Sequence, residues 1–486
     1  MAAANGRVKG AKIMIDRLTE ILGPGHVLTG AEAEPYGWDW NHEHFEAPLA
    51  VVRPGTTEEV SAVMKLAHET GTPVIPLGGR TGLAGGGQGE GALVVSLERM
   101  NRIREIRPGA RSAVVEAGVV IARLHEAVEE QGMIFPLTFG ARGSAMIGGA
   151  LATNAGGSNV LRYGNTRDLV LGIEAVLADG TVVDLMQDLH KNNSGYDLRH
   201  LLIGSEGTLA VITGAVLRLR PQPRAYATAM VGMAALPPAL DLLNRLQEAT
   251  GGAVEAFEYM PASYVDDYAR LRPGTRAPFE ARHEVNILLE IGALSPRDCV
   301  AGEDGVLPVA AYLEEVLGRM LEDGEIDDAV IAASEAQRRE MWALREAASE
   351  VASMRPDQII MDVAVPVDRV AEFLSRADEM LEGLAPGSAT SVVAHLGDGN
   401  IHYTIFPTLP KSEKDRVVEA IEDIVADLRG AFSAEHGVGT HKLNTMARRK
   451  DPGALAAMRA IKAALDPKGI LNPGKLLPEA SGAVAK

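Results

Sequence analysis

The chain contains 486 residues, of which 46% are apolar and 23% charged, the balance of a globular protein with two or three domains. The net charge of −18 argues against nucleic acid and an anionic membrane surface as partners, and it means that an anionic substrate needs a local cationic pocket. The single cysteine, Cys299, excludes a disulfide framework, a cysteine-ligated zinc site and an iron–sulfur cluster held by this chain alone.

Targeting and membrane segments are not predicted. Residues 1–30 lack the apolar core of a signal peptide, and residues 11–22 instead predict a short amphipathic helix. No window reaches the roughly 18 consecutive apolar residues of a transmembrane helix. We therefore expect the protein in the cytoplasm.

Regular structure becomes readable at residues 48–54, which have the composition of a buried strand. Thr56 and Glu59 follow at the spacing of a capping box, and they open a predicted helix that ends near Gly71. Residues 72–77 predict the next strand. The three segments together indicate a β-α-β unit.

A glycine-rich loop, residues 78–91, follows this second strand, and eight of its fourteen residues are glycine. Backbone amides in such a loop can approach a ligand closely, and successive amides form a concave site suited to a diphosphate. A flexible surface loop is the alternative interpretation. Residues 87–92 match a GxGxxG fingerprint, but a strand follows at 92–97 where that motif must open a helix, so we reject a nicotinamide Rossmann site.

A second glycine-rich segment occupies residues 136–164. Within it we predict a helix over residues 144–152, whose N-terminus is a second candidate diphosphate site. Asp179-Gly180 then predicts a hairpin between two strands. Pro221 to Pro223 reads as a domain boundary, and residues 335–354 beyond it predict one long helix that bears Arg338, Arg339 and Arg345.

A hairpin is also predicted over residues 392–406, around the dipeptide Asp398-Gly399. With these two residues as the turn, His395 lies directly opposite His402 on one face, with Cβ atoms about 5 Å apart. Two imidazoles placed in this way can share a metal ion, and Glu435 is the candidate third ligand. A His₂Glu set leaves coordination positions open, as catalytic ions require. Solvated or hydrogen-bonded histidines are the alternative.

The combination of these segments resembles a known family, the flavin-linked D-2-hydroxy acid dehydrogenases of the vanillyl-alcohol-oxidase-like superfamily. Its members include D-2-hydroxyglutarate dehydrogenase, D-lactate dehydrogenase and the glycolate oxidase flavin subunit. The matching stretches span most of the chain and are residues 76–87, 136–179, 204–213, 395–402, 433–439 and 472–475.

The resemblance implies an α+β fold with a two-subdomain FAD-binding domain and an α/β substrate-binding cap domain built on an antiparallel sheet. The expected domains are residues 1–223 (core 48–223), 224–430, and a C-terminal segment, 431–486, that brings the active-site Glu and His and returns to the FAD domain. The cofactor implied is FAD, bound non-covalently because the first glycine loop contains no histidine.

The resemblance also assigns FAD contacts along both glycine-rich loops, near residue 206 and at the returning C-terminal segment. The residues implied are Pro76, Gly78, Gly79, Arg80, Thr81, Gly82, Leu83, Pro136, Gly140, Ser144, Ile147, Gly148, Gly149, Thr153, Asn154, Gly156, Gly157, Glu206, Gly207, Ile212 and Asn472.

For the catalytic centre, the resemblance implies that His395, His402 and Glu435 ligate a divalent ion, with zinc favoured and manganese or iron as alternatives. His436 is then the proton acceptor and Arg345 the ligand of the substrate's carboxylate. The implied reaction places the α-hydroxyl on the metal, moves its proton to His436 and transfers the Cα hydride to flavin, giving a 2-oxo acid.

Substrate choice depends on one departure from the family pattern. Hydroxyglutarate-type relatives tend to carry a lysine two positions before the aspartate that matches Asp362, whereas this chain has Ile360. An apolar residue cannot pair a distal carboxylate, so we expect a small monocarboxylate such as D-lactate or glycolate. Arg338 or Arg339 could compensate, and D-2-hydroxyglutarate is the alternative.

Two other functions remain open at this point: an oxygen-using flavin oxidase of a sugar or alcohol, and a flavin-binding subunit that turns over only with a partner. The expected partners are a small anionic 2-hydroxy acid and an electron acceptor, which is a quinone, a cytochrome or an electron-transferring flavoprotein. The expected oligomeric state is a homodimer.

Overall fold

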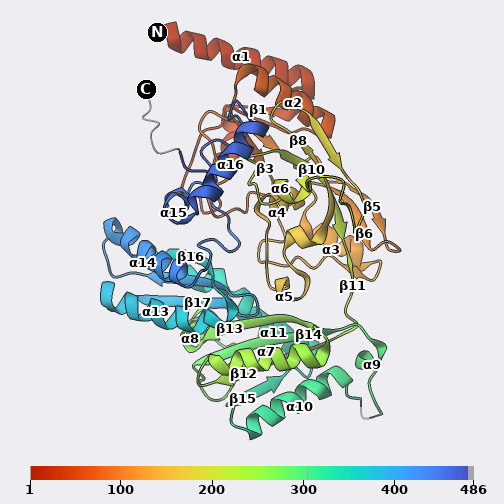
Figure 1. The fold of residues 1–486 in the computed structure, drawn as a ribbon, viewed down its shortest axis with the longest axis vertical. Helices are drawn as coiled ribbons and strands as arrows, with labels where there is room; N and C mark the ends of the chain where they lie inside the picture. The colour runs from red at the N-terminus through yellow and green to blue at the C-terminus, as the bar shows by residue number, and fades with distance from the viewer. Residues whose placement is uncertain (1, 304, 480–486) are drawn as a thin grey trace. The chain divides into compact units, whose positions relative to one another are not determined.

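A computed structural model describes residues 2–303 and 305–479, and its contacts divide the chain into two compact units. Unit 1 comprises Met1–Ala155, Asn165–Arg220 and Glu435–Lys486, and unit 2 comprises Gly156–Gly164 and Pro221–Ala434. Each unit has its own hydrophobic core. Figure 1 shows the helices and strands of the chain. Among the described residues, no helix combines the length and apolarity that crossing a membrane would require.

Unit 1 begins with a small sheet in the order β1-β2-β4-β3, in which β2, β4 and β3 run parallel. The predicted β-α-β unit is confirmed, with β4 inserted between its two strands. Thr56 Oγ1 accepts a hydrogen bond from the Glu59 amide and starts the helix, and Gly71 ends it with a left-handed φ of 67°. The elements are α1 (Ala2–Leu22), β1 (Val27–Leu28), β2 (Ala50–Val52), α2 (Thr57–Thr70), β3 (Val74–Leu77) and β4 (Leu93–Ser96).

A second sheet of unit 1 is antiparallel, in the order β5-β6-β10-β8-β9. The hairpin predicted at Asp179-Gly180 is confirmed, because Val176 pairs with Val182 and Gly180 has φ 84°. The strands are β5 (Ile103–Arg107), β6 (Ser112–Glu116), β8 (Val170–Val176), β9 (Val182–Leu185) and β10 (Val211–Arg218). The helices that follow these segments or close the unit are α3 (Ile121–Glu129), α4 (Ile147–Thr153), α6 (Leu198–Leu202), α15 (Leu443–Arg449) and α16 (Pro452–Leu465).

Unit 2 is built on one seven-stranded antiparallel sheet in the order β15-β12-β14-β13-β17-β18-β16. Its strands are β12 (Ala225–Met233), β13 (Val254–Pro261), β14 (Val285–Ala293), β15 (Asp328–Ile331), β16 (Ile359–Ala364), β17 (Ala389–His395) and β18 (Asn400–Phe406). Its helices are α5 (Val160–Tyr163), α7 (Pro237–Thr250), α8 (Ala262–Leu271), α9 (Pro296–Cys299), α10 (Pro308–Glu322), α11 (Glu335–Glu346), α12 (Ala348–Ala352), α13 (Val370–Leu384) and α14 (Lys414–Asp427).

Different helices pack against the two faces of this sheet (Figure 1). The main apolar core lies between one face and α7, α10, α13 and α14. The opposite face packs its middle against α8, α11 and α12 through residues such as Met230, Leu288 and Val393. Because side chains alternate along each strand, that second face also carries a polar row, which we call the charged row. Its members are Thr228, Glu290, Glu258, His395, His402 and Asp362.

The single helix predicted over residues 335–354 is wrong, because the structure breaks it into α11 and α12 at Ala347. The Tyr264 hydroxyl donates to the Leu344 carbonyl at 2.7 Å. A continuous helix would use that carbonyl for the amide four residues later, so the tyrosine competes with the helical hydrogen bond at the break.

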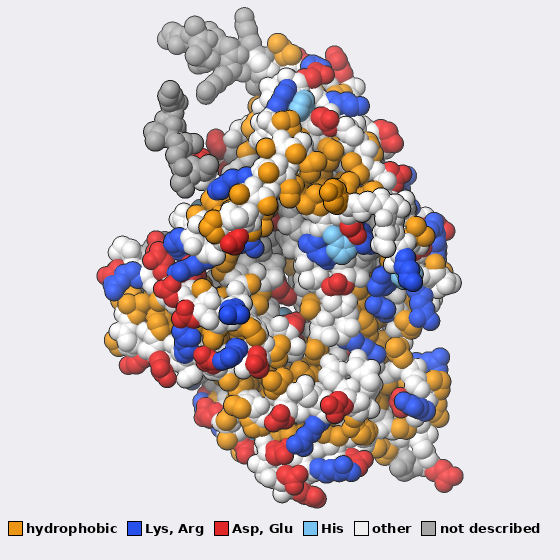
Figure 2. Space-filling model, viewed as in Figure 1, with side chains coloured by type: hydrophobic (Ala, Val, Ile, Leu, Met, Phe, Trp, Pro, Cys, Tyr) orange, Lys and Arg blue, Asp and Glu red, His pale blue; other side chains and the backbone are white. Residues whose placement is uncertain are grey.

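Figure 2 shows acidic and basic side chains interspersed over the face of the molecule in view. The negative net charge is therefore not gathered into one acidic patch on that face.

Candidate functional site

The two glycine-rich segments that were predicted to hold a cofactor lie side by side in unit 1. A Cβ on Gly79 would fall 2.1 Å from the Ser144 carbonyl oxygen, and one on Gly78 would fall 3.4 Å from the Gly149 nitrogen. Only glycine permits the approach at residue 79, whereas the distance at residue 78 is an ordinary van der Waals contact. By contrast, the Cβ position of Gly82 meets no described atom within 4 Å, so the loop also offers open backbone.

The helix in the second segment differs from its prediction. It begins at Ile147 instead of Ser144, and its first two amides are already used: Ile147 donates to Val119 O at 2.9 Å and Gly148 to Ala117 O at 2.7 Å. The helix N-terminus therefore has fewer free donors than the predicted diphosphate site needs. The glycine-rich loop after β3, residues 78–91, is therefore the better candidate for binding the diphosphate.

Asn472 joins several of the predicted cofactor segments. Its amide donates to Val74 O at 2.8 Å, and its Nδ2 donates to Gly86 O at 3.0 Å and Glu206 O at 2.7 Å. Its Oδ1 is buried with no hydrogen-bond partner among the described residues. A buried carbonyl oxygen without a donor is costly, so this atom fits a ligand that brings a donor group.

The remaining predicted cofactor residues are distributed around this place. A Cβ on Gly207 would lie 3.1 Å from Pro76 Cγ, so these two positions also adjoin. The Arg80 side chain donates to Pro35 O at 2.7 Å and lies over the Tyr36 ring. The other positions are Thr81 and Leu83 on the first loop, Pro136, Gly140, Thr153 and Asn154 on or beside the second segment, Gly156 and Gly157 in unit 2, and Ile212 in β10.

In unit 2, the predicted pairing of His395 with His402 across the hairpin is wrong, because the strand register differs by two residues. His395 pairs with Asn400, and His402 pairs with Val393, so the two histidines are diagonal neighbours. The connection has four residues, because His395 O accepts from both Asp398 N and Gly399 N, and Gly399 has φ 81°. The shift moves one strand by two residues, which keeps both rings on one face. Their centroids lie 5.4 Å apart.

His395 belongs to a buried charged triad with Glu258 and Arg345. Its Nδ1 lies 2.9 Å from Glu258 Oε1, and Arg345 Nε donates to the other oxygen of Glu258 at 2.7 Å. Burial acts to raise the Glu258 pKa, but the charges and hydrogen bonds of His395 and Arg345 outweigh it and hold the pKa below its usual value. The other ring nitrogen of His395, Nε2, lies 3.4 Å from Arg345 Nη2.

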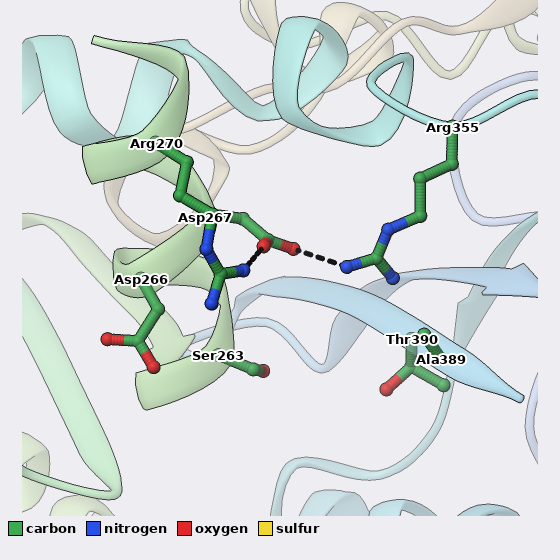
Figure 3. Close-up of a pocket in the computed structure, with 7 residues that line it drawn as sticks. All are labelled: Ser263, Asp266, Asp267, Arg270, Arg355, Ala389 and Thr390. Atoms are coloured by element: carbon green, nitrogen blue, oxygen red, sulfur yellow. Dashed lines mark hydrogen bonds and ion pairs between the residues drawn. The ribbon is translucent and has the colours of Figure 1, made fainter. Parts of the chain in front are cut away.

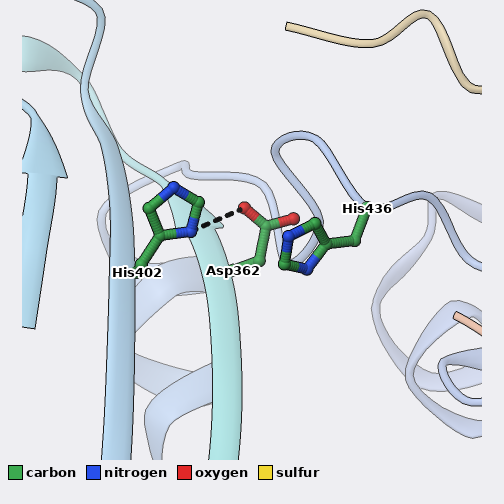
Figure 4. Close-up of side chains that lie close together, drawn as sticks. All are labelled: Asp362, His402 and His436. Atoms are coloured by element: carbon green, nitrogen blue, oxygen red, sulfur yellow. Dashed lines mark ion pairs between the residues drawn. The ribbon is translucent and has the colours of Figure 1, made fainter. Parts of the chain in front are cut away.

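His402 has a similar partner, since its Nδ1 lies 3.8 Å from Asp362 Oδ1 (Figure 4). Asp362 is almost fully buried and also accepts from Asn400 Nδ2 at 3.0 Å. A carboxylate behind each imidazole is the usual second shell of a metal-binding histidine. The residues present therefore fit a divalent ion with nitrogen and oxygen ligands.

Glu435 and His436 directly follow Ala434, the last residue of unit 2, in the sequence. The Ala434 amide donates to the Asp362 carbonyl of β16 at 3.3 Å. The Cα atoms of Glu435 and His436 follow one and two residues later, at steps of about 3.8 Å along the chain. Ligand atoms of His395, His402 and Glu435 come within 4.8 Å of one another, and those of Asp362, His402 and His436 form a second such set (Figure 4). His402 is common to both sets.

Sequence reasoning missed Glu258 as a partner of the predicted site. Residues 254–261 are a largely apolar strand in which glutamates at 255 and 258 are buried. A glutamate inside an apolar strand almost always has a cationic or hydrogen-bonding partner. That signal predicts a partner without naming it, because Glu258 and His395 are 137 residues apart.

A separate cavity lies elsewhere in unit 2. It has a volume of about 250 Å³ and is lined by Ser263, Asp266, Asp267, Arg270, Arg355, Ala389 and Thr390 (Figure 3). Asp267 lies between Arg270 and Arg355, which together neutralise it. The cavity is at the opposite end of β17 from His395, about 20 Å along the strand, and it is separate from the histidine cluster.

Two family models of known proteins match the chain. Residues 48–186 match the family model "FAD binding domain", and residues 222–476 match "FAD linked oxidases, C-terminal domain". The D-2-hydroxyglutarate dehydrogenase of Xanthomonas citri pv. viticola is 36% identical over 92% of this chain and 93% of that protein. The mitochondrial D-2-hydroxyglutarate dehydrogenase of Bos taurus is 37% identical over 94% of this chain and 82% of that protein.

Solved structures with the same fold have much lower identity. A substrate-bound p-cresol methylhydroxylase gives a TM-score of 0.73 at 16% identity, covering 97% of both chains. The 4-ethylphenol oxidase of Gulosibacter chungangensis gives 0.71 at 19% identity, covering 96% of this chain and 97% of that one.

The chain thus has an α+β fold that it shares with these two solved structures. The chain belongs to the FAD-linked oxidase family, and it is an FAD-dependent oxidoreductase with relatives that act on CH–OH donors.

Proposed function

We propose that this protein is a dehydrogenase of D-2-hydroxy acids, with D-2-hydroxyglutarate as its substrate and a 2-oxo acid as its product. The observation that carries the proposal is the buried triad of His395, Glu258 and Arg345 beside the second histidine, because it sets a cation next to a fitted metal site. The relatives named for D-2-hydroxyglutarate support the substrate class.

Each protein group has a role in this proposal. FAD, when bound, supplies the acceptor for the hydride, and a divalent ion on His395, His402 and Glu435 supplies a Lewis acid for the α-hydroxyl. Arg345 binds the carboxylate, since its Nη1 makes no hydrogen bond to any residue that the structure describes. His436 takes the hydroxyl proton. Electrons then leave to a quinone, a cytochrome or an electron-transferring flavoprotein.

D-lactate is a second candidate substrate, and one feature of the sheet favours it. Ile360 lies two residues before Asp362 on the same face, with 45% of its surface exposed. It offers no charge to a distal carboxylate. Arg338 is committed to Glu290 through bonds of 2.6 and 2.7 Å, so it is not free to compensate.

An anaerobic assay of the flavin's visible band separates these readings. D-2-hydroxyglutarate, D-lactate, glycolate and the L-enantiomers are each mixed with the holoenzyme in a stopped-flow instrument. We expect rapid bleaching by D-2-hydroxyglutarate and none by the L-acids. Faster bleaching by D-lactate would select the second candidate, and bleaching by none of the acids would reject both.

Replacing Arg345 by lysine should raise KM for the hydroxy acid by about 10- to 100-fold. A charge-assisted hydrogen bond contributes about 1.5–3 kcal/mol, and an ammonium cannot bridge Glu258 and a substrate carboxylate as a planar guanidinium does. Steady-state kinetics measures the change. Arg319→Lys, at an exposed position on α10, is the control and should leave KM unchanged.

A further inference from the structure

The Glu206 side chain is committed to a backbone segment far along the chain. Its Oε1 accepts the Val438 amide at 2.8 Å, and its Oε2 accepts the Gly439 amide at 2.7 Å. An ionised carboxylate has about four acceptor sites, so the FAD contact that the resemblance implies for Glu206 stays a prediction beside these two bonds. Burial raises the pKa of Glu206, and the two amide bonds and the charge of Lys442 oppose that rise.

The contact leaves no room for a side chain at either of the two glycines that flank Val438. A Cβ on Gly437, which has φ 79°, would fall 2.9 Å from Glu206 Oε1. A Cβ on Gly439, with φ 50°, would fall 1.9 Å from the Ala84 carbonyl oxygen. Two successive amides aimed at one carboxylate form an anion-binding concavity, here filled by the protein's own side chain.

Glu206 itself is held in an unusual conformation. It has a left-handed φ of 51°, which a non-glycine residue adopts only where its surroundings enforce it. Its own amide donates to Ala152 O at 2.8 Å, and its carbonyl accepts from Asn472 Nδ2. Such enforced backbone geometry is concentrated at functional sites.

From this geometry we infer that Glu206 is a positioning residue. It fixes the backbone of residues 437–439 and thereby the positions of the preceding residues, Glu435 and His436. The inference rests on the roles proposed for those two residues. Gly437 directly follows His436. Loss of the hydrogen bonds from residues 438 and 439 to Glu206 would therefore displace His436, the proposed proton acceptor, and Glu435, the proposed metal ligand, together. Glu206 acts through the main chain and touches neither substrate nor metal.

The test compares Glu206→Gln with Glu206→Asp. A glutamine has one acceptor oxygen and an NH₂ group that would face an amide N–H, so one of the two amides loses its partner. Aspartate keeps two acceptors on a shorter stem and should recover part of the effect. Glu116→Gln is the matched control, because Glu116 is a buried glutamate in unit 1 that also accepts a backbone amide, that of Arg102 at 2.9 Å.

Hydrogen–deuterium exchange of the holoenzyme gives a readout that does not depend on activity. We expect the peptide covering 435–441 to exchange at least tenfold faster in Glu206→Gln, with Glu206→Asp in between and Glu116→Gln unchanged. Flavin reduction should slow by about 10- to 100-fold in Glu206→Gln at an unchanged FAD content, as when a supporting partner of a site is removed.

Unchanged exchange at 435–441, or faster exchange with an unchanged rate of flavin reduction, would overturn the inference. An equal loss of rate in Glu116→Gln would do so as well, since it would show a general effect of a buried glutamate. If the wild-type protein oxidises no 2-hydroxy acid, the proposed function fails separately. The affinity for added Zn²⁺ then decides: a wild-type affinity in Glu206→Gln would also overturn the inference.

Discussion

His436→Ala should abolish flavin reduction by the hydroxy acid while FAD stays bound. A general base contributes about 10²- to 10⁴-fold to the rate, and no other group in the proposal takes the hydroxyl proton. Stopped-flow bleaching of the flavin band measures the rate, and the absorbance of the purified protein measures the FAD content.

His190→Ala serves as the control for this variant, since His190 lies on an exposed stretch of unit 1. Its rate should equal that of the wild type. A wild-type rate in His436→Ala would remove His436 from the scheme and leave the second ligand set, with Asp362 and His402, as the place to look for the base.

Removal of the metal should reduce activity by at least about 100-fold, and His402→Ala should do the same. His402 belongs to both candidate ligand sets, so its loss disables either one. The measurements are metal content by mass spectrometry and turnover before and after a chelator, with Zn²⁺, Mn²⁺ or Fe²⁺ added back.

The matched control is His200→Ala, because His200 also lies near an aspartate, Asp197, at an exposed position outside the charged row. It should keep both its metal and its turnover. Full activity after exhaustive chelation would contradict the metal role and would favour the sugar or alcohol oxidase reading, which needs no ion.

Local signals in the sequence predicted local structure well. Thr56 and Gly71 bound α2 as their capping chemistry requires, and Gly180 turns the β8–β9 hairpin in a left-handed conformation. The facing of His395 and His402 toward one side of the sheet was also predictable, because side chains alternate with a period of two.

Features that depend on distant residues were not predictable. The hairpin connection is longer than the dipeptide signal indicates, because the His395 carbonyl accepts two amides of the turn. The break at Ala347 follows from a tyrosine on α8, 80 residues away. Glu258 could be recognised as a buried charge but not paired with His395, since no local pattern joins them.

The stripe of Arg338, Trp342 and Arg345 along α11 constrains how this protein can change. All three side chains reach glutamates on the sheet: Arg338 and Trp342 bond to Glu290, and Arg345 bonds to Glu258. An insertion or deletion of one residue between them would rotate the downstream arginine by about 100° around the helix axis. Length variation should therefore be tolerated in the loops flanking α11 and rejected within it, whereas amino-acid replacement on its outer side is free.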